Sequence, residues 1–164
     1  MRKSSKTTAR SGNVRKSDSF REAWKRINEA KEQKFFLEAV TIQESIICDR
    51  LIAYLHRNHG FPAKTKNDKH HRLSDLVRAL QKHEPNRVRR NGKPMADEIK
   101  RWADQRNRVV HSIVRSDPGL PTAPVEEFLA LAAEAAAAGE ALAREVERMR
   151  PPAPRKQPLT STGE

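Results

Sequence analysis

Apolar residues recur at every third or fourth position between residues 34 and 59, and this pattern constrains the fold more than any other feature of the chain. The main stripe consists of Phe36, Val40, Ile47, Leu51 and Leu55. Such spacing places the apolar side chains on one face of an α-helix, whereas a half-buried strand would show strict alternation. A glycine and a proline follow at positions 60 and 62, as is typical beyond the C-terminus of a helix. The sequence therefore predicts a long helix over residues 34–59.

Four further segments have helical patterns, so we expect a bundle of about five helices. A first helix is expected to begin at Ser17 or Asp18, because either side chain can cap it, and to end near residue 33. The other three are a short helix around residues 73–80, a long one over about 95–116 and an alanine-rich one over about 124–149. The fold class is thus all-α, with the helices 34–59 and 95–116 packed antiparallel.

The composition of the chain predicts one folded domain between two tails. Residues 1–17 are rich in Ser, Thr, Lys and Arg, and residues 150–164 are rich in proline, so we expect both segments to be disordered. Residues 18–149 hold both tryptophans and almost all of the large aliphatic residues. This middle segment can form a core of modest size, and a dimer would bury one further apolar face.

Positive charge is concentrated in two blocks of a chain whose formal net charge is +12. Residues 1–16 contain six basic residues and no acid, whereas residues 61–93 contain ten basic and three acidic residues. Concentrated basic charge is typical of surfaces that bind polyanions, most commonly nucleic acid. A solvated arm explains the first block equally well, but apolar residues interleaved in the second block favour an ordered RNA-binding or DNA-binding surface. The expected RNA-binding residues are Lys64, Lys66, Lys69, Arg72, Arg87, Arg89, Arg90, Lys93 and Arg108.

Several classes of protein are excluded by residues that the chain lacks. The single cysteine, Cys48, excludes a disulfide framework and a cysteine-rich zinc site. The adjacent histidines 70 and 71 have no carboxylate or cysteine at ligand spacing, so we expect no metal and no cofactor. No apolar run approaches the roughly 18 residues of a membrane-spanning helix, and no glycine-rich phosphate loop occurs. We therefore expect a cytoplasmic protein with no membrane segment.

The clearest candidate for chemistry lies in the expected helix 95–116, where Arg106 and Asn107 precede His111. An arginine followed by a histidine at this distance carries little information, because other pairs in the chain fit a similar spacing. Arg106 differs in being followed directly by an asparagine. Asn107 and His111 are four residues apart and share one face of the helix. The other pairs are Arg50 with His56 and Arg78 with His83.

The segment from Arg106 to His111 resembles the RNxxxH form of the Rx4-6H motif of HEPN domains, and residues 36–51 resemble the helix that precedes this motif in bacterial defence proteins. The resemblance covers about residues 20–117. It implies an all-α dimeric domain, many examples of which are metal-independent endoribonucleases in toxin–antitoxin, abortive-infection and CRISPR systems. It further implies that Arg106, Asn107 and His111 are catalytic, and that RNA, a second copy of the chain and an antitoxin protein or RNA are partners.

One position departs from the family pattern. HEPN toxins that are paired with nucleotidyltransferase antitoxins carry a tyrosine two residues after the motif histidine, and the antitoxin modifies that tyrosine. This chain has Ile113 at the corresponding position. We therefore do not expect neutralisation by modification of that side chain.

The residue types of the motif also suit RNA cleavage by their own chemistry. Attack of the 2′-hydroxyl on the adjacent phosphate requires proton transfer, for which histidine is well suited near neutral pH. The guanidinium of Arg106 can bind two phosphoryl oxygens, and Asn107 can orient the histidine ring or bind the sugar or phosphate. A two-fold dimer would supply both an acid and a base. The expected products are a 2′,3′-cyclic phosphate and a 5′-hydroxyl.

Two other functions remain open from the sequence. The chain could be a non-catalytic RNA-binding bundle of the HEPN type, or a basic helical protein that coats nucleic acid. Three residues of the helix 34–59 could line a cleft beside Arg106. We favour the alternative interpretation, in which they form salt bridges at the surface. These residues are Glu44, Asp49 and Arg50, and the last two are the stronger candidates to support the site.

Overall fold

The computed structural model describes residues 5–67, 69–89, 91–112 and 124–149, and over this part of the chain the fold is all-α. Its helices are α1 (Ser5–Glu32), α2 (Phe36–His59), α3 (Leu73–His83), α4 (Met95–Ser112) and α5 (Val125–Glu147). Among the described residues the only β-type pairing is an isolated bridge between Val88 and Pro94. The prediction of an all-α bundle of about five helices is confirmed.

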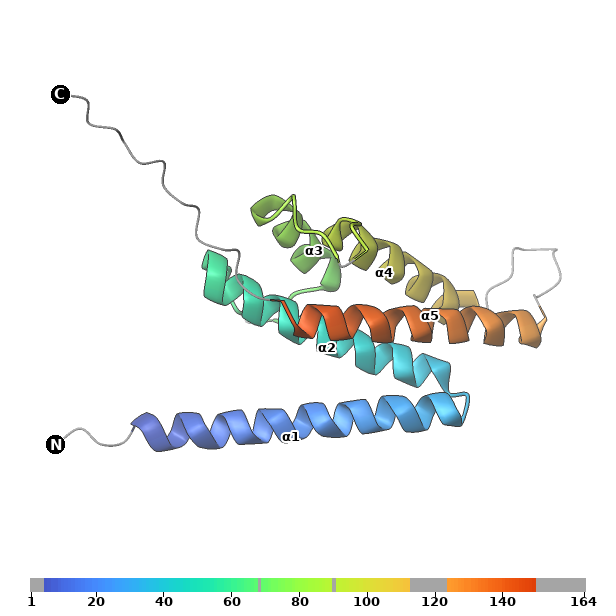
Figure 1. The fold of residues 1–164 in the computed structure, drawn as a ribbon, viewed down its shortest axis with the longest axis horizontal. Coiled ribbons are helices and arrows are strands. Elements are labelled where there is room, and N and C mark those ends of the chain that lie inside the picture. The colour runs from blue at the N-terminus through green and yellow to red at the C-terminus, as the bar shows by residue number, and fades with distance from the viewer. Residues whose placement is uncertain (1–4, 68, 90, 113–123, 150–164) are drawn as a thin grey trace, which may run out of the picture.

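Helix α2 lies at the centre of the bundle and packs against α1, α3 and α5 (Figure 1). Helices α1 and α2 form an antiparallel hairpin, whereas α2 and α5 run in the same direction. The long helices α2 and α4 run in opposite directions, as predicted, but each packs more extensively against α5 than against the other. Helix α5 therefore has a central part in the core, although the sequence shows it to be rich in alanine.

Small residues on α5 explain its central place. Its buried face consists mainly of alanines and one glycine, which let α5 approach α2 and α4 closely. A methyl group added at Gly139 would lie 2.7 Å from Nε1 of Trp102 on α4, closer than carbon and nitrogen atoms normally approach. Most of the large side chains of the core come from the other helices, whereas α5 contributes Leu142 and Val146. Those from the other helices include Ile27, Ile47, Leu51, Leu80 and Ile99.

The N-terminal boundary of α1 differs from the expectation. The helix begins at Ser5 and not at Ser17 or Asp18, so the described residues of the expected disordered arm continue it. Contacts made by that segment support a longer helix, because Nζ of Lys16 lies 2.9 Å from Oδ1 of Asp49 on α2. Residues 1–4, the expected disordered tail 150–164 and the expected end of α4 at residue 116 lie outside the described residues.

Candidate active site

Helix α4 presents the predicted motif toward α2 and α3. Burial of Trp102 and Val109 fixes the rotation of α4 about its axis, and Nε1 of Trp102 donates a hydrogen bond of 2.9 Å to the carbonyl oxygen of Ala135 on α5. Val110, the residue after Val109, is exposed because it points away from this packed face. The rotation leaves Arg106 and Asn107 at the edge of a cavity.

This cavity, of about 710 Å³, lies where α2, α3 and α4 meet. Its apolar wall contains aliphatic side chains of α3 and α4 and the thiol of Cys48, and its charged lining contains more cations than anions. The cations are Arg72, Arg78, Lys100 and Arg106, and the anions are Glu44 and Asp104. Since four cationic side chains and only two carboxylates line the cavity, it suits an anionic ligand better than a cationic one.

An ion pair joins the predicted arginine to α2. An Nη atom of Arg106 donates a hydrogen bond to Oε1 of Glu44, and both side chains are largely buried. The Nε atom of Arg106 is also buried and has no hydrogen-bond partner in the described part of the chain. The guanidinium is therefore held at one edge by Glu44, while its Nε donor remains unused.

The pKa of the Cys48 thiol is influenced by both members of this ion pair. Burial and, to a smaller extent, the negative charge of Glu44 raise the pKa of the thiol to about 12, while the positive charge of Arg106 opposes the rise. A thiol with such a pKa is protonated near neutral pH and is a poor nucleophile. Cys48 is therefore part of the wall of the cavity, in agreement with its place in an apolar turn of α2.

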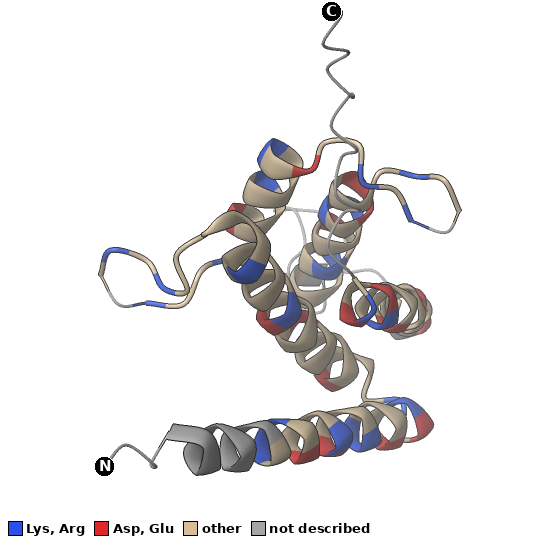
Figure 2. Cartoon of the chain, turned by 60° about the vertical axis from the view of Figure 1, so that its left-hand side comes forward, with Lys and Arg blue, Asp and Glu red and all other residues tan. Residues whose placement is uncertain are grey.

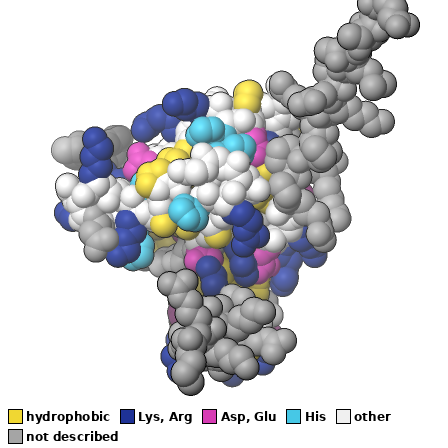
Figure 3. Space-filling view, turned by 90° about the vertical axis from the view of Figure 1, so that its left-hand side faces the viewer, with side chains coloured by type: hydrophobic (Ala, Val, Ile, Leu, Met, Phe, Trp, Pro, Cys, Tyr) yellow, Lys and Arg dark blue, Asp and Glu magenta, His cyan; other side chains and the backbone are white. Residues whose placement is uncertain are grey.

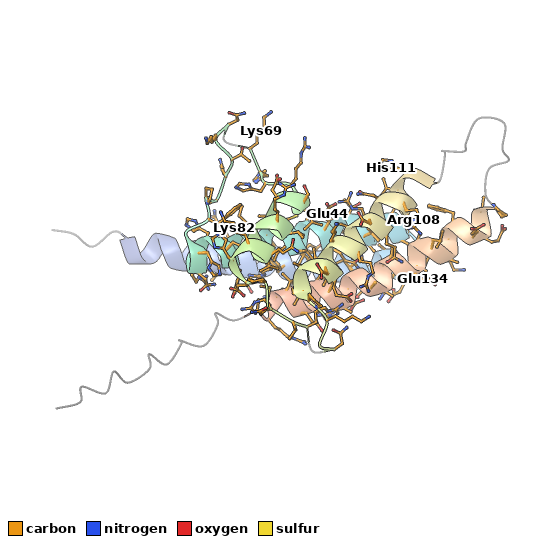
Figure 4. All side chains as sticks on the ribbon, turned by 90° about the horizontal axis from the view of Figure 1, so that it is seen from above. Glu44, Lys69, Lys82, Arg108, His111 and Glu134 are labelled. Carbon is orange, nitrogen blue, oxygen red and sulfur yellow. The ribbon has the colours of Figure 1, made fainter. Side chains whose placement is uncertain are left out.

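The predicted histidine lies apart from the cavity. His111 is exposed in the last turn of α4 and is not among the residues that line the cavity. In Figure 4 it lies on the same side of the bundle as the loop that carries Lys69. One chain thus brings Arg106, Asn107 and Glu44 together but leaves His111 at the surface beyond them.

The other two residues expected to support the site do not reach it. Asp49 pairs with Lys16 of α1, and Arg50 lies 3.5 Å from a carboxylate oxygen of Glu147 on α5. The guanidinium of Arg50 also stacks on the ring of Phe20, at 3.7 Å from its centroid. Of the three residues considered on α2, Glu44 is the one that contacts Arg106.

Two of the predicted RNA-binding arginines have structural contacts instead. Arg87 donates hydrogen bonds to Glu84 and Tyr54, and Arg89 lies between Glu98 and Glu145. Both side chains are largely buried in these ion pairs, so their prediction as phosphate ligands is not supported by their placement. Arg90 lies outside the described residues. The remaining predicted residues are exposed: Lys64, Lys66, Lys69, Arg72, Lys93 and Arg108.

The two basic loops project on opposite sides of the bundle (Figures 2 and 4). The loop between α2 and α3 carries Lys64, Lys66 and Lys69, and its last residues, His71 and Arg72, line the cavity. The loop between α3 and α4 lies near the C-terminal end of α5, where Arg89 meets Glu145. The predicted RNA-binding residues therefore do not form one continuous surface, and those of the α2–α3 loop are the ones next to Arg106.

A network around Glu84 was not predicted from the sequence. Oη of Tyr54 donates a hydrogen bond of 2.5 Å to Oε1 of Glu84, Nε2 of His59 lies 2.6 Å from the same oxygen, and Arg87 binds the other oxygen. Burial alone would raise the pKa of Glu84, but hydrogen bonds from Tyr54, Arg87 and His59 lower it below its usual value. Burial, followed by the hydrogen bond to Glu84, raises the pKa of Tyr54.

This network fixes a hairpin-like turn that one local signal could have indicated. The dipeptide Asn91-Gly92 is typical of tight turns, and Gly92 has the positive φ of 77° that such a turn requires. The backbone nitrogen of Arg89 donates a hydrogen bond of 2.8 Å to the carbonyl oxygen of Lys93. The buried ion pairs of Arg87 and Arg89 then join this turn to the ends of α2, α4 and α5.

No group of three or more His, Cys, Asp or Glu side chains in the described part of the chain is arranged to hold a metal ion. None of the helices in the described ranges is long and apolar enough to cross a membrane. Comparison of the chain with protein-family models, with curated proteins and with solved structures finds no match.

Proposed function

We propose that this protein is a metal-independent endoribonuclease of the HEPN type, acting as a toxin or as an anti-phage or abortive-infection effector. The observation that carries the proposal is the placement of Arg106 and Asn107 in one cavity with three further cations, Arg72, Arg78 and Lys100. A cavity of about 710 Å³ is large enough for a small ligand or one nucleotide unit of a strand. Its cationic lining favours the phosphate.

In the proposed reaction the 2′-hydroxyl attacks the adjacent phosphorus. The 2′-oxygen forms the new bond to phosphorus while the bond to the 5′-oxygen breaks, and the products are a 2′,3′-cyclic phosphate and a 5′-hydroxyl. One histidine accepts the proton of the 2′-hydroxyl, and a protonated group donates a proton to the departing 5′-oxygen. Arg106 stabilises the charge that develops on the phosphoryl oxygens.

The contacts of Arg106 suit this role. A guanidinium has five N–H donors, and the contact with Glu44 uses one edge of it. The Nε atom of Arg106 has no partner among the described residues, but it is buried, so a phosphoryl oxygen would reach it only after the side chain moves. Glu44 would then orient the guanidinium, much as carboxylates orient arginines in other buried pairs.

The exposed position of His111 favours a site completed by a second copy of the chain. His111 and the neighbouring Val110 are both exposed at the C-terminal end of α4, so a two-fold contact there would cover an apolar residue. Such a dimer would bring two histidines to one interface and supply both the acid and the base. The chain would therefore cleave RNA as a homodimer.

A second candidate function rests on the same observation about His111. Because the cavity contains Arg106 and Asn107 but not His111, the site can bind a phosphate without a group to move the proton. The alternative is thus a non-catalytic RNA-binding bundle of the HEPN type. It predicts RNA binding that depends on Arg106, with no cleavage.

The test is cleavage of labelled single-stranded RNA at pH 7.5 in excess chelator, with the product ends mapped. Arg106→Ala and His111→Ala are each expected to abolish cleavage, whereas Asn107→Ala retains part of it. The matched controls are Arg101→Ala, an exposed arginine earlier on α4, and His83→Ala, both of which are expected to cleave normally. Products with a 3′-hydroxyl, or activity in His111→Ala, would overturn the mechanism. Binding without cleavage by the wild-type protein would favour the alternative.

A further inference from the structure

The cavity between α2, α3 and α4 has an apolar part and a cationic part, which differ in their exposure to solvent. The apolar wall consists of side chains that are buried or half-buried: Cys48, Leu73, Val77 and Ala103. The cationic rim, as we name the second part, consists of three exposed side chains: Arg72, Arg78 and Lys100. A ligand would therefore place its apolar part inward, against the wall, and its anionic part outward, at the rim.

Helical spacing explains why the apolar wall lies directly beside positive charge. On α3, Leu73 and Val77 are four residues apart and share one buried face. On α4, Ala103 is three residues from both Lys100 and Arg106, so a cation lies one turn to either side of it. A ligand that packs against Ala103 can therefore bring an anionic group to either of these cations.

The cations of the rim are exposed and only weakly paired. Arg78 lies 3.4 Å from Asp75, but 78% of its side chain is exposed, and such surface pairs contribute little. Of the two carboxylates in the lining, Glu44 is bound to Arg106, whereas Asp104 is exposed. Three rim cations thus face one exposed carboxylate, which leaves the rim positive.

Positive charge by itself does not identify the ligand. Lysine and arginine side chains are also spread over other parts of the surface, such as the end of the bundle shown in Figure 3. Charge of this kind attracts any polyanion. The cavity differs because it combines a cationic rim with an apolar wall. A nucleotide has the same two parts, since its base is a flat ring system with apolar faces and its phosphate is an anion.

Uncharged polar side chains of the lining favour a nucleotide over an anionic lipid, which also has an apolar and a charged part. These side chains are Ser74, Gln81 and Asn107. Each of them has hydrogen-bonding groups that the edge of a base could use, whereas an acyl chain could use none of them. The volume of about 710 Å³ lies within the range of about 300–1,000 Å³ that is usual for sites of small ligands.

We propose that the apolar wall is a base-binding subsite, which receives one unpaired base of the RNA while the adjoining phosphate lies among Arg106 and the cations of the rim. The inference rests on the proposed function for the identity of the substrate. It narrows that substrate to RNA with an unpaired base, as in single strands, loops and bulges. A base within a duplex is paired and stacked, so it would have to flip out of the helix at an energetic cost.

The experiment compares two strands that carry the same phosphates but differ in their bases. A labelled 2′-O-methyl single strand cannot be cut by 2′-hydroxyl attack, so its fluorescence anisotropy with the full-length protein reports binding alone. The matched strand has abasic sites in place of the bases. We expect the wild-type protein to bind the strand with bases at least about tenfold more tightly than the abasic strand. Equal affinity for the two strands would overturn the proposal.

Variants of the wall and of the rim separate the two parts of the cavity. Ala103→Leu fills the space beside the wall and is expected to reduce the preference for bases to about twofold or less. The control Ala137→Leu, at an exposed position of α5, is expected to keep the full preference. The double variant Arg72→Gln with Lys100→Gln is expected to weaken binding of both strands by the same factor. A full preference for bases in Ala103→Leu, with its fold verified by circular dichroism, would overturn the proposal.

Alkylation of Cys48 locates the bound base in the wild-type protein and needs no variant. Cys48 is part of the apolar wall and is the one cysteine of the chain. At saturating concentrations, we expect the strand with bases to slow the loss of free thiol more than the abasic strand or a blunt duplex does. Both single strands carry the same phosphates, so an effect of their charge on the thiol is common to both. Equal protection by all three would refute a subsite for an unpaired base.

The outcomes for this inference and for the proposed function can be told apart. Cleavage of ordinary RNA by a protein that binds the two strands equally would refute the base-binding subsite alone. A preference for bases that Ala103→Leu removes, without cleavage of any RNA, would refute the proposed nuclease and support the subsite.

Discussion

The side-chain amide of Gln43 on α2 donates a hydrogen bond of 2.8 Å to the backbone carbonyl of Ala136 on α5. Gln43 is completely buried, and its Oε1 atom has no hydrogen-bond partner among the described residues. Sliding α5 along α2 would break this hydrogen bond and leave the buried amide donor of Gln43 unpaired as well, which would lower the stability of the fold. The contact therefore fixes how α2 and α5, which run in the same direction, are aligned along their length.

Gly139→Ala is expected to destabilise the protein by about 1–2 kcal/mol. The added methyl group would collide with Trp102 and with the side chain of Gln43, and overpacking of a core costs about 1–3 kcal/mol. Alanine recovers up to about 1 kcal/mol through its higher helix propensity. Urea unfolding followed by circular dichroism measures the difference. Ala138→Gly, at the exposed neighbouring position, calibrates the propensity effect. A Gly139→Ala protein more stable than wild type would show that α5 does not approach α2 and α4 this closely.

Lys34→Gly is expected to stabilise the protein by about 0.5–1 kcal/mol. Lys34 has a φ of 61°, in the left-handed region that costs residues with a side chain about 1–2 kcal/mol. It follows the end of α1, where the backbone nitrogen of Phe35 donates a hydrogen bond of 2.7 Å to the carbonyl oxygen of Ala30. This is the position at which helices usually place glycine. Thermal unfolding provides the measurement.

The control for Lys34→Gly is the reverse change at the end of α2. Gly60 has a similar φ of 64°, and no atom lies within 4 Å of the position that a Cβ would occupy. Gly60→Ala is therefore expected to cost about 1 kcal/mol through backbone conformation alone. A gain of stability in Lys34→Gly together with a loss in Gly60→Ala would support a left-handed backbone at both positions. A loss of stability in both variants would contradict it at Lys34.

Glu84→Gln is expected to lower stability at pH 7 by about 1–3 kcal/mol, because it leaves Arg87 and His59 without their shared carboxylate. The pKa of Glu84 is lowered in the folded state, so its ionised form is bound more strongly there than in the unfolded chain. The stabilisation from ionised Glu84 is fully present at pH values above its ordinary pKa of 4.5, and it is lost as the pH falls through the lower pKa that Glu84 has in the folded state. The difference between wild type and Glu84→Gln should therefore shrink below pH 4.5. A constant difference from pH 7 to pH 3 would contradict the lowered pKa.

The reactivity of Cys48 provides a chemical probe of the ion pair beside it. Because the negative charge of Glu44 contributes to raising the pKa of the thiol, Glu44→Gln should lower that pKa and speed alkylation at pH 8 several-fold. Arg106→Gln removes a charge that lowers the pKa, so it should slow the reaction. The chain has one cysteine, so loss of free thiol measures this site alone. Ser45→Ala, an exposed change on α2, should react at the wild-type rate. Equal rates in all four proteins would place Cys48 away from the pair.

The helical segments could be predicted from the sequence alone, because helix formation depends on spacings of three and four residues that can be counted along the chain. The apolar stripe of α2 and its stop at Gly60 are local features of this kind, and both agree with the structure. The early start of α1 shows where local signals fail. Ser17 and Asp18 can cap a helix, but no local rule requires the helix to begin there. The contact of Lys16 with Asp49 joins residues 33 positions apart, so no local pattern in the sequence indicates it.

Contacts between residues that are distant in the sequence depend on how the helices pack. The pairing of Arg106 with Glu44 spans 62 positions of the chain, and that of Arg89 with Glu145 spans 56, so neither could follow from a periodic pattern. The same applies to α5, whose small residues indicated a good helix former but not that it would pack along α2. Whether an arginine faces solvent or a buried carboxylate depends on the packing of helices that are distant in sequence. Residue type and spacing therefore predicted Arg106, Asn107 and His111 as one site. The packing of the helices places Arg106 and Asn107 at the cavity and leaves His111 outside it.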